Sequence, residues 1–347
     1  MSATDTLDWL FAARPSGSDD GAPLSLAPDL AWLRTGIVNV AFLGLPDAGD
    51  RGWVLVDTGL PGMADTIAKA AEHRFGPHAR PAAIVLTHGH FDHTGAARTL
   101  AERWDAPVYA HPLELPYLTG RSAYPPPDPT VGGGVLARLA MLYPSGSINL
   151  GNHIHPLPAD GVVPGAAAWQ WLHTPGHAPG HVSLFRDSDK LLVAGDAFVT
   201  TKQESLEAVW TQRREMHGPP MHFTPDWNAA RESVRLLAAL EPEVAITGHG
   251  LPMRGAPLRA GLVALSNAFD VMALPRQGRY RERPAITDEN GIVSVPPALT
   301  DLLPIAFGLG VGLIVGLLTA RAATGDDVVM RSGDADRSVV AKRRHAM

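Results

Sequence analysis

The 347-residue chain contains no cysteine. Disulfide bonds, thiol nucleophiles, iron–sulfur clusters and cysteine-ligated metal sites are therefore excluded, so histidine and carboxylate side chains must hold any metal. The chain also lacks an excess of basic residues. Its formal net charge is −6, which argues against nucleic acid as a main partner. The N-terminal residues lack a basic region followed by an unbroken apolar run, so no secretory signal is expected there.

Three of the fifteen histidines, by contrast, lie within one short stretch, residues 87–95. The apolar residues 82–86 before it predict a buried strand, and residues 95–104 after it predict a helix. Imidazole nitrogen and carboxylate oxygen are ligands for zinc, iron and manganese. The stretch holds four such side chains within six positions: His88, His90, Asp92 and His93. The two histidines at i and i+2 leave the strand end on the same side, whereas Asp92 and His93 begin the helix and can face a second ion.

Strands and helices alternate in two successive halves of the chain. Three strand ends deliver a histidine or aspartate, which is where α/β folds place their chemistry. Strands are expected at residues 31–44, 52–59, 82–86, 107–111, 168–173, 181–186, 190–196 and 243–249, and helices at 62–74, 95–104, 225–240 and 257–274. Residues 113–158 have a weaker pattern, interpreted either as an insertion over the site or as a plain surface excursion.

Further donors occur in short motifs far along the chain, and with them the sequence resembles the metallo-β-lactamase-fold hydrolases. The resemblance covers roughly residues 28–273. It rests on His-x-His-x-Asp-His at 88–93, Thr-Pro-Gly-His at 174–177, Gly-Asp at 195–196, Gly-His-Gly at 248–250 and Asp-Thr-Gly at 57–59.

The resemblance implies an αββα sandwich, with two mixed β-sheets flanked by helices. It also implies seven metal ligands: His88, His90 and His177 for one ion, Asp92, His93 and His249 for the second, and Asp196 bridging both. Seven donors with one bridging carboxylate suit two ions about 3.5–4 Å apart. Two divalent ions are therefore expected, zinc first, with iron or manganese as alternatives.

Such a centre implies hydrolysis by a hydroxide that bridges the metals. The hydroxide attacks a carbonyl, and Asp92 is the catalytic residue that orients it and carries its proton to the leaving group. The absence of cysteine excludes the zinc β-lactamases with a cysteine ligand, and Asp196 points to the glyoxalase II-like and lactonase-like branch. The expected substrate is a small thioester, lactone or other ester. Two alternatives stay open: a mono-iron enzyme similar to persulfide dioxygenases, and a non-catalytic metal-binding module on the same fold.

Four residues near these motifs have supporting roles in the prediction. His181 and His173 are expected to hydrogen-bond a ligand or carboxylate. Asp57 is expected to hold the site loop through backbone hydrogen bonds. Lys202 either meets an anionic substrate or is a solvated loop lysine.

The expected domain order places an N-terminal arm at 1–27, the hydrolase domain at 28–275, a Pro/Arg-rich connector at 276–301, an apolar helix at 302–320 and a polar, disordered tail at 321–347. Residues 302–320 carry no charge and have nearly the length that spans a bilayer. Their glycines at four-residue spacing are typical of membrane helix pairs. The helix is interpreted either as a membrane anchor or as a segment that docks on the hydrolase or on a second subunit of a homo-oligomer. A cytoplasmic protein is expected, membrane-associated if the anchor interpretation holds.

Overall fold

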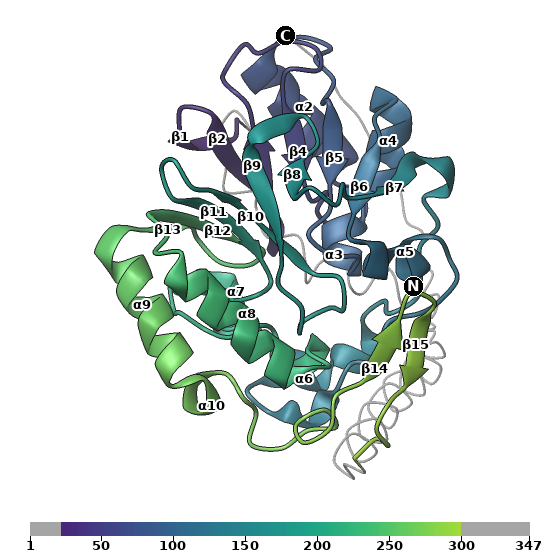
Figure 1. Cartoon of the computed structure of the whole chain (residues 1–347), viewed down its shortest axis with the longest axis vertical. Helices are drawn as coiled ribbons and strands as arrows, with labels where there is room; N and C mark the ends of the chain where they lie inside the picture. Colours follow the sequence, from purple (N-terminus) through teal and green to yellow (C-terminus); the bar gives the residue numbers. More distant parts are fainter. Residues whose placement is uncertain (1–21, 300–347) are drawn as a thin grey trace, which may run out of the picture. The chain divides into compact units, whose positions relative to one another are not determined.

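The structure is a computed structural model that describes residues 22–299 (Figure 1). The predicted segments at 302–320 and 321–347 lie outside these residues, as does most of the predicted arm. Within residues 22–299, no helix is both long and apolar enough to cross a membrane.

The first half of the described chain forms a seven-stranded mixed sheet. Its strands are β1 (Leu24–Ala27), β2 (Leu30–Thr35), β3 (Val38–Leu43), β4 (Val54–Val56), β5 (Ala83–Val85), β6 (Val108–Ala110) and β7 (Ile154–Pro156), in that spatial order. Strands β1 to β4 pair antiparallel, and β4 to β7 pair parallel. Strand β1 therefore adds residues of the predicted arm to the edge of this sheet.

The second half forms a six-stranded mixed sheet. Its strands are β8 (Val162–Val163), β9 (Ala166–His173), β10 (Val182–Arg186), β11 (Leu191–Gly195), β12 (Val244–Thr247) and β13 (Met253–Arg254), with the spatial order β13-β12-β11-β10-β9-β8. Only β11 and β12 pair parallel; the other neighbours in this sheet are antiparallel.

Side-chain alternation explains why the two sheets pack face to face. In β2, Leu30 and Trp32 join the core between the sheets, while Ala31 and Leu33 join the core on the opposite face. Strand β11 alternates in the same way between the inner core and an outer core. Because both faces of these strands are apolar, each sheet must be covered on both sides.

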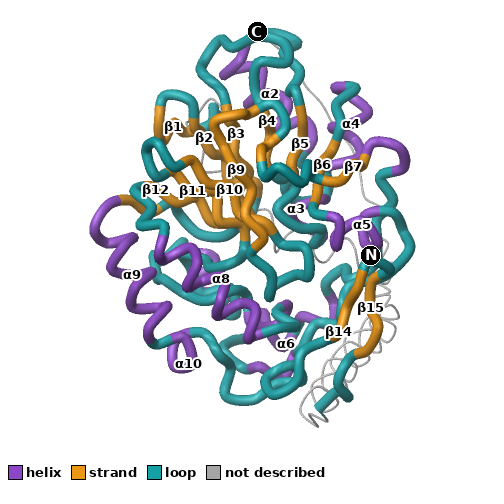
Figure 2. The backbone as a smooth tube through the Cα atoms, in the orientation of Figure 1, coloured by secondary structure: helices purple, strands orange, loops and turns teal. Residues whose placement is uncertain are grey.

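Helices cover the outer faces (Figure 2). On the first sheet, α2 (Ala64–Phe75) and α4 (Ala97–Trp104) contribute to the outer core. On the second, α8 (Trp227–Ala239) and α9 (Gly255–Asn267) do so. The predicted αββα sandwich is confirmed.

Two predicted elements are divided in the structure. The predicted strand at 31–44 is the hairpin β2–β3, because Gly36 takes a left-handed φ of +72° that reverses the chain. The predicted helix at 257–274 ends at Asn267, and α10 (Phe269–Met272) follows it.

Short helical turns joined by irregular loops run along residues 113–158. They are η1 (Pro112–Glu114), α5 (Leu115–Leu118), η2 (Pro129–Val131), α6 (Val135–Arg138), η3 (Ala140–Leu142) and η4 (Gly151–His153). The predicted connector contains a hairpin, β14 (Ile286–Asp288) with β15 (Gly291–Ser294). The connector contacts residues 113–158, since the Tyr280 hydroxyl donates to the Pro126 carbonyl at 2.7 Å.

Candidate metal centre

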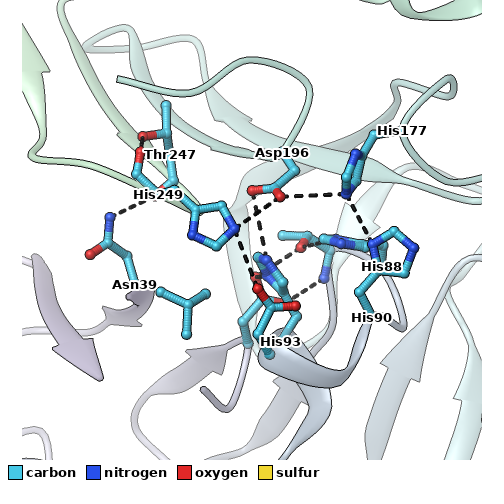
Figure 3. A network of polar contacts seen from close by, with 12 residues as sticks. Asn39, His88, His90, His93, His177, Asp196, Thr247 and His249 are labelled. Carbon is cyan, nitrogen blue, oxygen red and sulfur yellow. Dashed lines mark hydrogen bonds and ion pairs between the residues drawn. The ribbon is translucent and has the colours of Figure 1, made fainter. Parts of the chain in front are cut away.

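The seven predicted ligands come together where strands of both sheets end. His88 and His90 follow β5, Asp196 follows β11, and His249 follows β12. His177 lies in the loop between β9 and β10, and Asp92 and His93 lie in α3 (Phe91–Thr94). Each of the seven side chains is buried, with at most 8% of its surface exposed. Figure 3 shows six of them around a common centre.

The first triad consists of His88, His90 and His177. Their ring centroids are 4.6–4.8 Å apart, and the rings stand nearly perpendicular to one another. His90 Nδ1 lies 2.9 Å from His177 Nε2. One potential ligand atom of each residue lies within 4.8 Å of the other two, a spacing at which three nitrogens can hold one ion.

The second triad consists of Asp92, His93 and His249, whose potential ligand atoms also lie within 4.8 Å of one another. His249 Nε2 is 3.4 Å from Asp92 Oδ2. The other ring nitrogen, His249 Nδ1, donates to the Ile37 carbonyl at 2.8 Å. This bond fixes the ring so that Nε2 faces the cluster.

Asp196 lies between the two triads (Figure 3). Its Oδ2 atom is 3.4 Å from His177 Nε2 and 3.2 Å from His249 Nε2. Its Oδ1 atom is 3.7 Å from His93 Nε2. One carboxylate therefore reaches donors of both triads.

Three buried atoms of this cluster have no hydrogen-bond partner in the described part of the chain: His88 Nε2, His93 Nε2 and Asp196 Oδ1. Leaving a buried polar atom unpaired costs about 1–3 kcal/mol. These atoms belong to one group whose ligand atoms lie within 4.8 Å of one another. A cation among them would supply the missing partner, so the residues present fit a metal.

Burial keeps the first triad uncharged. It lowers the pKa of His90 to about 3 and holds the pKa values of His88 and His177 well below the ordinary value, with neighbouring histidines adding to the effect. Neutral imidazoles have a lone pair free for a metal.

The two histidines of the second triad have raised pKa values instead. Burial lowers the pKa of His93, but the carboxylates of Asp57, Asp196 and Asp92 outweigh it and raise the pKa well above the ordinary value. Asp196 and Asp92 likewise raise the pKa of His249 against the effect of burial. A metal ion that binds the rings of His93 and His249 must therefore displace a proton from each ring.

Asp57 anchors the site loop. The Thr87 amide and hydroxyl donate to its two carboxylate oxygens, each at 2.8 Å. Its Oδ2 also lies 2.8 Å from His93 Nδ1. Asp57 therefore holds the loop as expected, and in addition it orients one ring of the second triad.

The two remaining histidines differ. The Asp196 amide donates to His181 Nε2 at 2.9 Å, so His181 Nδ1 carries the proton and donates to Thr174 Oγ1. His181 thus helps to hold the backbone of Asp196 in position. For His173 the expectation is wrong: its ring bonds the Pro179 carbonyl and stacks on His111, away from the cluster.

Sequence reasoning missed Glu114, which is fully buried. Its carboxylate accepts hydrogen bonds from the Gly89 amide at 2.9 Å and the Gly180 amide at 2.7 Å, and the Tyr124 hydroxyl donates to it as well. The one signal was a lone acid in a mostly apolar run at 112–118.

A cavity of about 570 Å³, including its open mouth, lies beside the cluster. Five of the predicted ligands line it: His90, Asp92, His177, Asp196 and His249. The other lining residues are Ile37, Phe91, Leu136, Tyr143, Gln203, Leu206, Val209, Pro220, His222 and Phe223. Lys202 is not among them.

Comparisons with known proteins identify similar sequences. A family model described as the metallo-beta-lactamase superfamily matches residues 33–249. The probable metallo-hydrolase YflN of Bacillus subtilis (strain 168) is 47% identical over 247 residues, which cover 71% of this chain and 93% of that protein. The probable metallo-hydrolase YybB of the same strain is 32% identical over 196 residues, covering 56% and 74%.

Two solved structures are also similar. TTHA1623 in a di-iron-bound form is 26% identical with a TM-score of 0.42, and the match covers 71% of this chain and 98% of that one. The BLEG-1 B3 metallo-beta-lactamase is 23% identical with a TM-score of 0.45, covering 67% and 94%.

Proposed function

Since the chain belongs to the metallo-beta-lactamase superfamily and is a metallo-hydrolase, we propose that it uses two divalent metal ions to hydrolyse a small ester, thioester or lactone. The observation that carries this proposal is the position of Asp196. Its carboxylate lies within 3.4 Å of a nitrogen in each triad, and such a shared carboxylate is typical of paired metals.

The first ion would be held by His88, His90 and His177. The second would be held by the donors of the other triad, Asp92, His93 and His249, with Asp196 between the two. Nitrogen and carboxylate donors without sulfur suit zinc, iron and manganese. We favour zinc, and metal analysis distinguishes the three.

Divalent ions in such a pair activate water as a nucleophile near neutral pH and polarise the carbonyl oxygen. The protein supplies the positioning. Asp92 lines the cavity, 3.4 Å from His249 Nε2, where its carboxylate can orient the attacking water. The same carboxylate would accept a proton from the water and pass it to the departing alkoxide or thiolate. An ester or thioester then gives a carboxylic acid with an alcohol or thiol, and a lactone gives a hydroxy acid.

The test combines metal analysis with a panel of ester, thioester and lactone substrates. We expect two metal ions per chain and hydrolysis that is lost on chelation and restored by metal. The Asp92→Asn substitution should lower kcat about 10²–10⁴-fold, the range for a lost proton-transfer group. The control Asp187→Asn changes a carboxylate whose side chain is 81% exposed and should leave kcat unchanged.

Two results would contradict the proposal. One iron per chain with oxygen uptake and no hydrolysis would favour the dioxygenase alternative. Metal binding without turnover of any substrate class would favour a non-catalytic module. An Asp92→Ala protein as fast as the parent would refute the role given to Asp92.

A further inference from the structure

We infer that the cavity beside the metal centre selects substrates whose acyl group is uncharged and apolar, and disfavours acyl groups that end in a carboxylate. This inference rests on the proposed function, because it names the substrate class for the same site. The argument starts from the residues that line the cavity.

Most of the wall beyond the predicted ligands is apolar. Seven of its side chains have no polar atom: Ile37, Phe91, Leu136, Leu206, Val209, Pro220 and Phe223. Burying apolar surface stabilises by roughly 25 cal/mol per Å². An aliphatic acyl chain that extends from the metal centre along this wall therefore gains affinity with each methylene it buries.

Among residues 22–299, no lysine or arginine lines this cavity. The polar groups of the wall, apart from the predicted ligands, are Tyr143, Gln203 and His222. His222 Nδ1 lies 4.0 Å from Glu204 Oε1, so a carboxylate stands beside any charge on that ring. An anionic acyl end would lose its hydration against apolar side chains without gaining a cationic partner away from the metals.

Several exposed side chains in the segments that carry wall residues are apolar as well. Leu206, which lines the cavity, begins α7 (Leu206–Thr211) and is 41% exposed, and Trp210 in the same helix is 70% exposed. Met141 and Leu142, which precede the lining residue Tyr143, are 61% and 64% exposed. These side chains add apolar surface to the segments that carry the wall residues Leu206 and Tyr143.

Five p-nitrophenyl esters test the inference on the metal-loaded full-length protein: acetate, butyrate, hexanoate, the monoester of adipate and its methyl ester. The adipate compound has the same six-carbon acyl chain as hexanoate but ends in a carboxylate, and the methyl ester removes that charge. We expect kcat/KM to rise by up to about fourfold per methylene from acetate to hexanoate. The adipate monoester should be at least about tenfold poorer than hexanoate, and its methyl ester should recover most of that loss.

A charge placed in the wall should change the preference. Leu206→Lys is expected to improve the adipate monoester relative to hexanoate by about two- to fivefold, as for a partly exposed ion pair. Val263→Lys adds the same charge on α9, at a 50% exposed position outside the cavity, and should keep the parent's ratio.

The outcomes separate the two proposals. Hydrolysis of hexanoate and the adipate monoester with equal kcat/KM would overturn the inference and leave the hydrolase intact. A preference for the monoester would do the same. If no ester, thioester or lactone is cleaved by the metal-loaded protein, the proposed function fails and this inference fails with it.

Discussion

Glu114 joins two loops that carry predicted metal ligands, although it is not itself one of those ligands. Its two oxygens accept bonds from the amides of Gly89, between His88 and His90, and of Gly180, just beyond His177. Burial raises the pKa of this carboxyl, although the bonds from Tyr124 and the two amides oppose the shift. The side chain therefore fixes the spacing between two parts of the first triad.

Replacing Glu114 by alanine should leave the buried Gly180 amide unpaired and leave the Gly89 amide with the Tyr124 hydroxyl, 2.9 Å away, as its acceptor. We expect a loss of about 2–4 kcal/mol in the free energy of unfolding and metal binding weakened about 10–100-fold. Urea unfolding measures the first effect, and titration against a competing chelator measures the second. Glu72→Ala, on the exposed face of α2, is the matched control and should change neither. A Glu114→Ala protein that binds metal like the parent would show that the residue has no positioning role.

The sequence predicts the candidate ligands, which the structure brings together, but not this support. The ligands stand in short motifs at strand ends, so local pattern and residue chemistry identify them. The bonds of Glu114 join positions 25 and 66 residues apart, and no local pattern encodes such contacts. The β2–β3 hairpin was missed for another reason: residues 31–44 are mostly apolar on both sides of Gly36, and one glycine does not show by itself that a strand turns back.

At the scale of elements, the loop after β12 must lie close to the predicted ligands Asp196 and His93. Gly248 lies beside Asp196 and His93. A Cβ atom added to it would lie 2.0 Å from Asp196 Oδ1 and 2.7 Å from His93 Cε1. Neither side chain can withdraw freely, because both are buried. Gly248, the first glycine of the Gly-His-Gly motif, is thus needed because a larger residue would collide with the Asp196 carboxylate.

Gly248→Ala should therefore displace the Asp196 carboxylate. We expect metal affinity to fall at least about tenfold and the free energy of unfolding to fall by about 1–3 kcal/mol, as for an overpacked core. Gly146→Ala is the control, since nothing lies within 4 Å of a Cβ added there. Metal content and urea unfolding of the two variants give the comparison, and equal metal affinity in both would contradict the spacing argument.

At the scale of the described domain, one ion pair links the two sheets. Arg186 ends β10 in the second sheet, and Asp29 lies in the turn between β1 and β2 in the first. Arg186 Nη2 donates to Asp29 Oδ1 at 2.8 Å, and a second bond joins Arg186 Nη1 to Asp29 Oδ2. The guanidinium also lies 5.0 Å from the Trp169 ring centroid. These contacts hold the end of β10, an interior strand of the second sheet, against the β1–β2 turn at the edge of the first.

The strength of this link should depend on pH. The hydrogen bonds from Arg186 lower the pKa of Asp29 below its ordinary value, against the effect of burial. A carboxyl with a lowered pKa in the folded state stabilises fully above its unfolded value, and the contribution is lost as the pH falls through the folded value. We expect Asp29→Asn to lower the free energy of unfolding by about 1 kcal/mol at pH 7, because the carboxylate is partly exposed and screened by solvent.

The difference in the free energy of unfolding between the parent and Asp29→Asn should then become smaller as the pH falls below 3.8. Urea unfolding of both proteins after metal removal measures it, since metal loss at low pH then plays no part. Asp187→Asn removes a carboxylate that pairs with Lys190 but is 81% exposed, so its effect should stay within about 0.5 kcal/mol at every pH. A loss for Asp29→Asn that is the same at pH 7 and at pH 3 would mean that the charge of Asp29 does not stabilise the contact between the sheets.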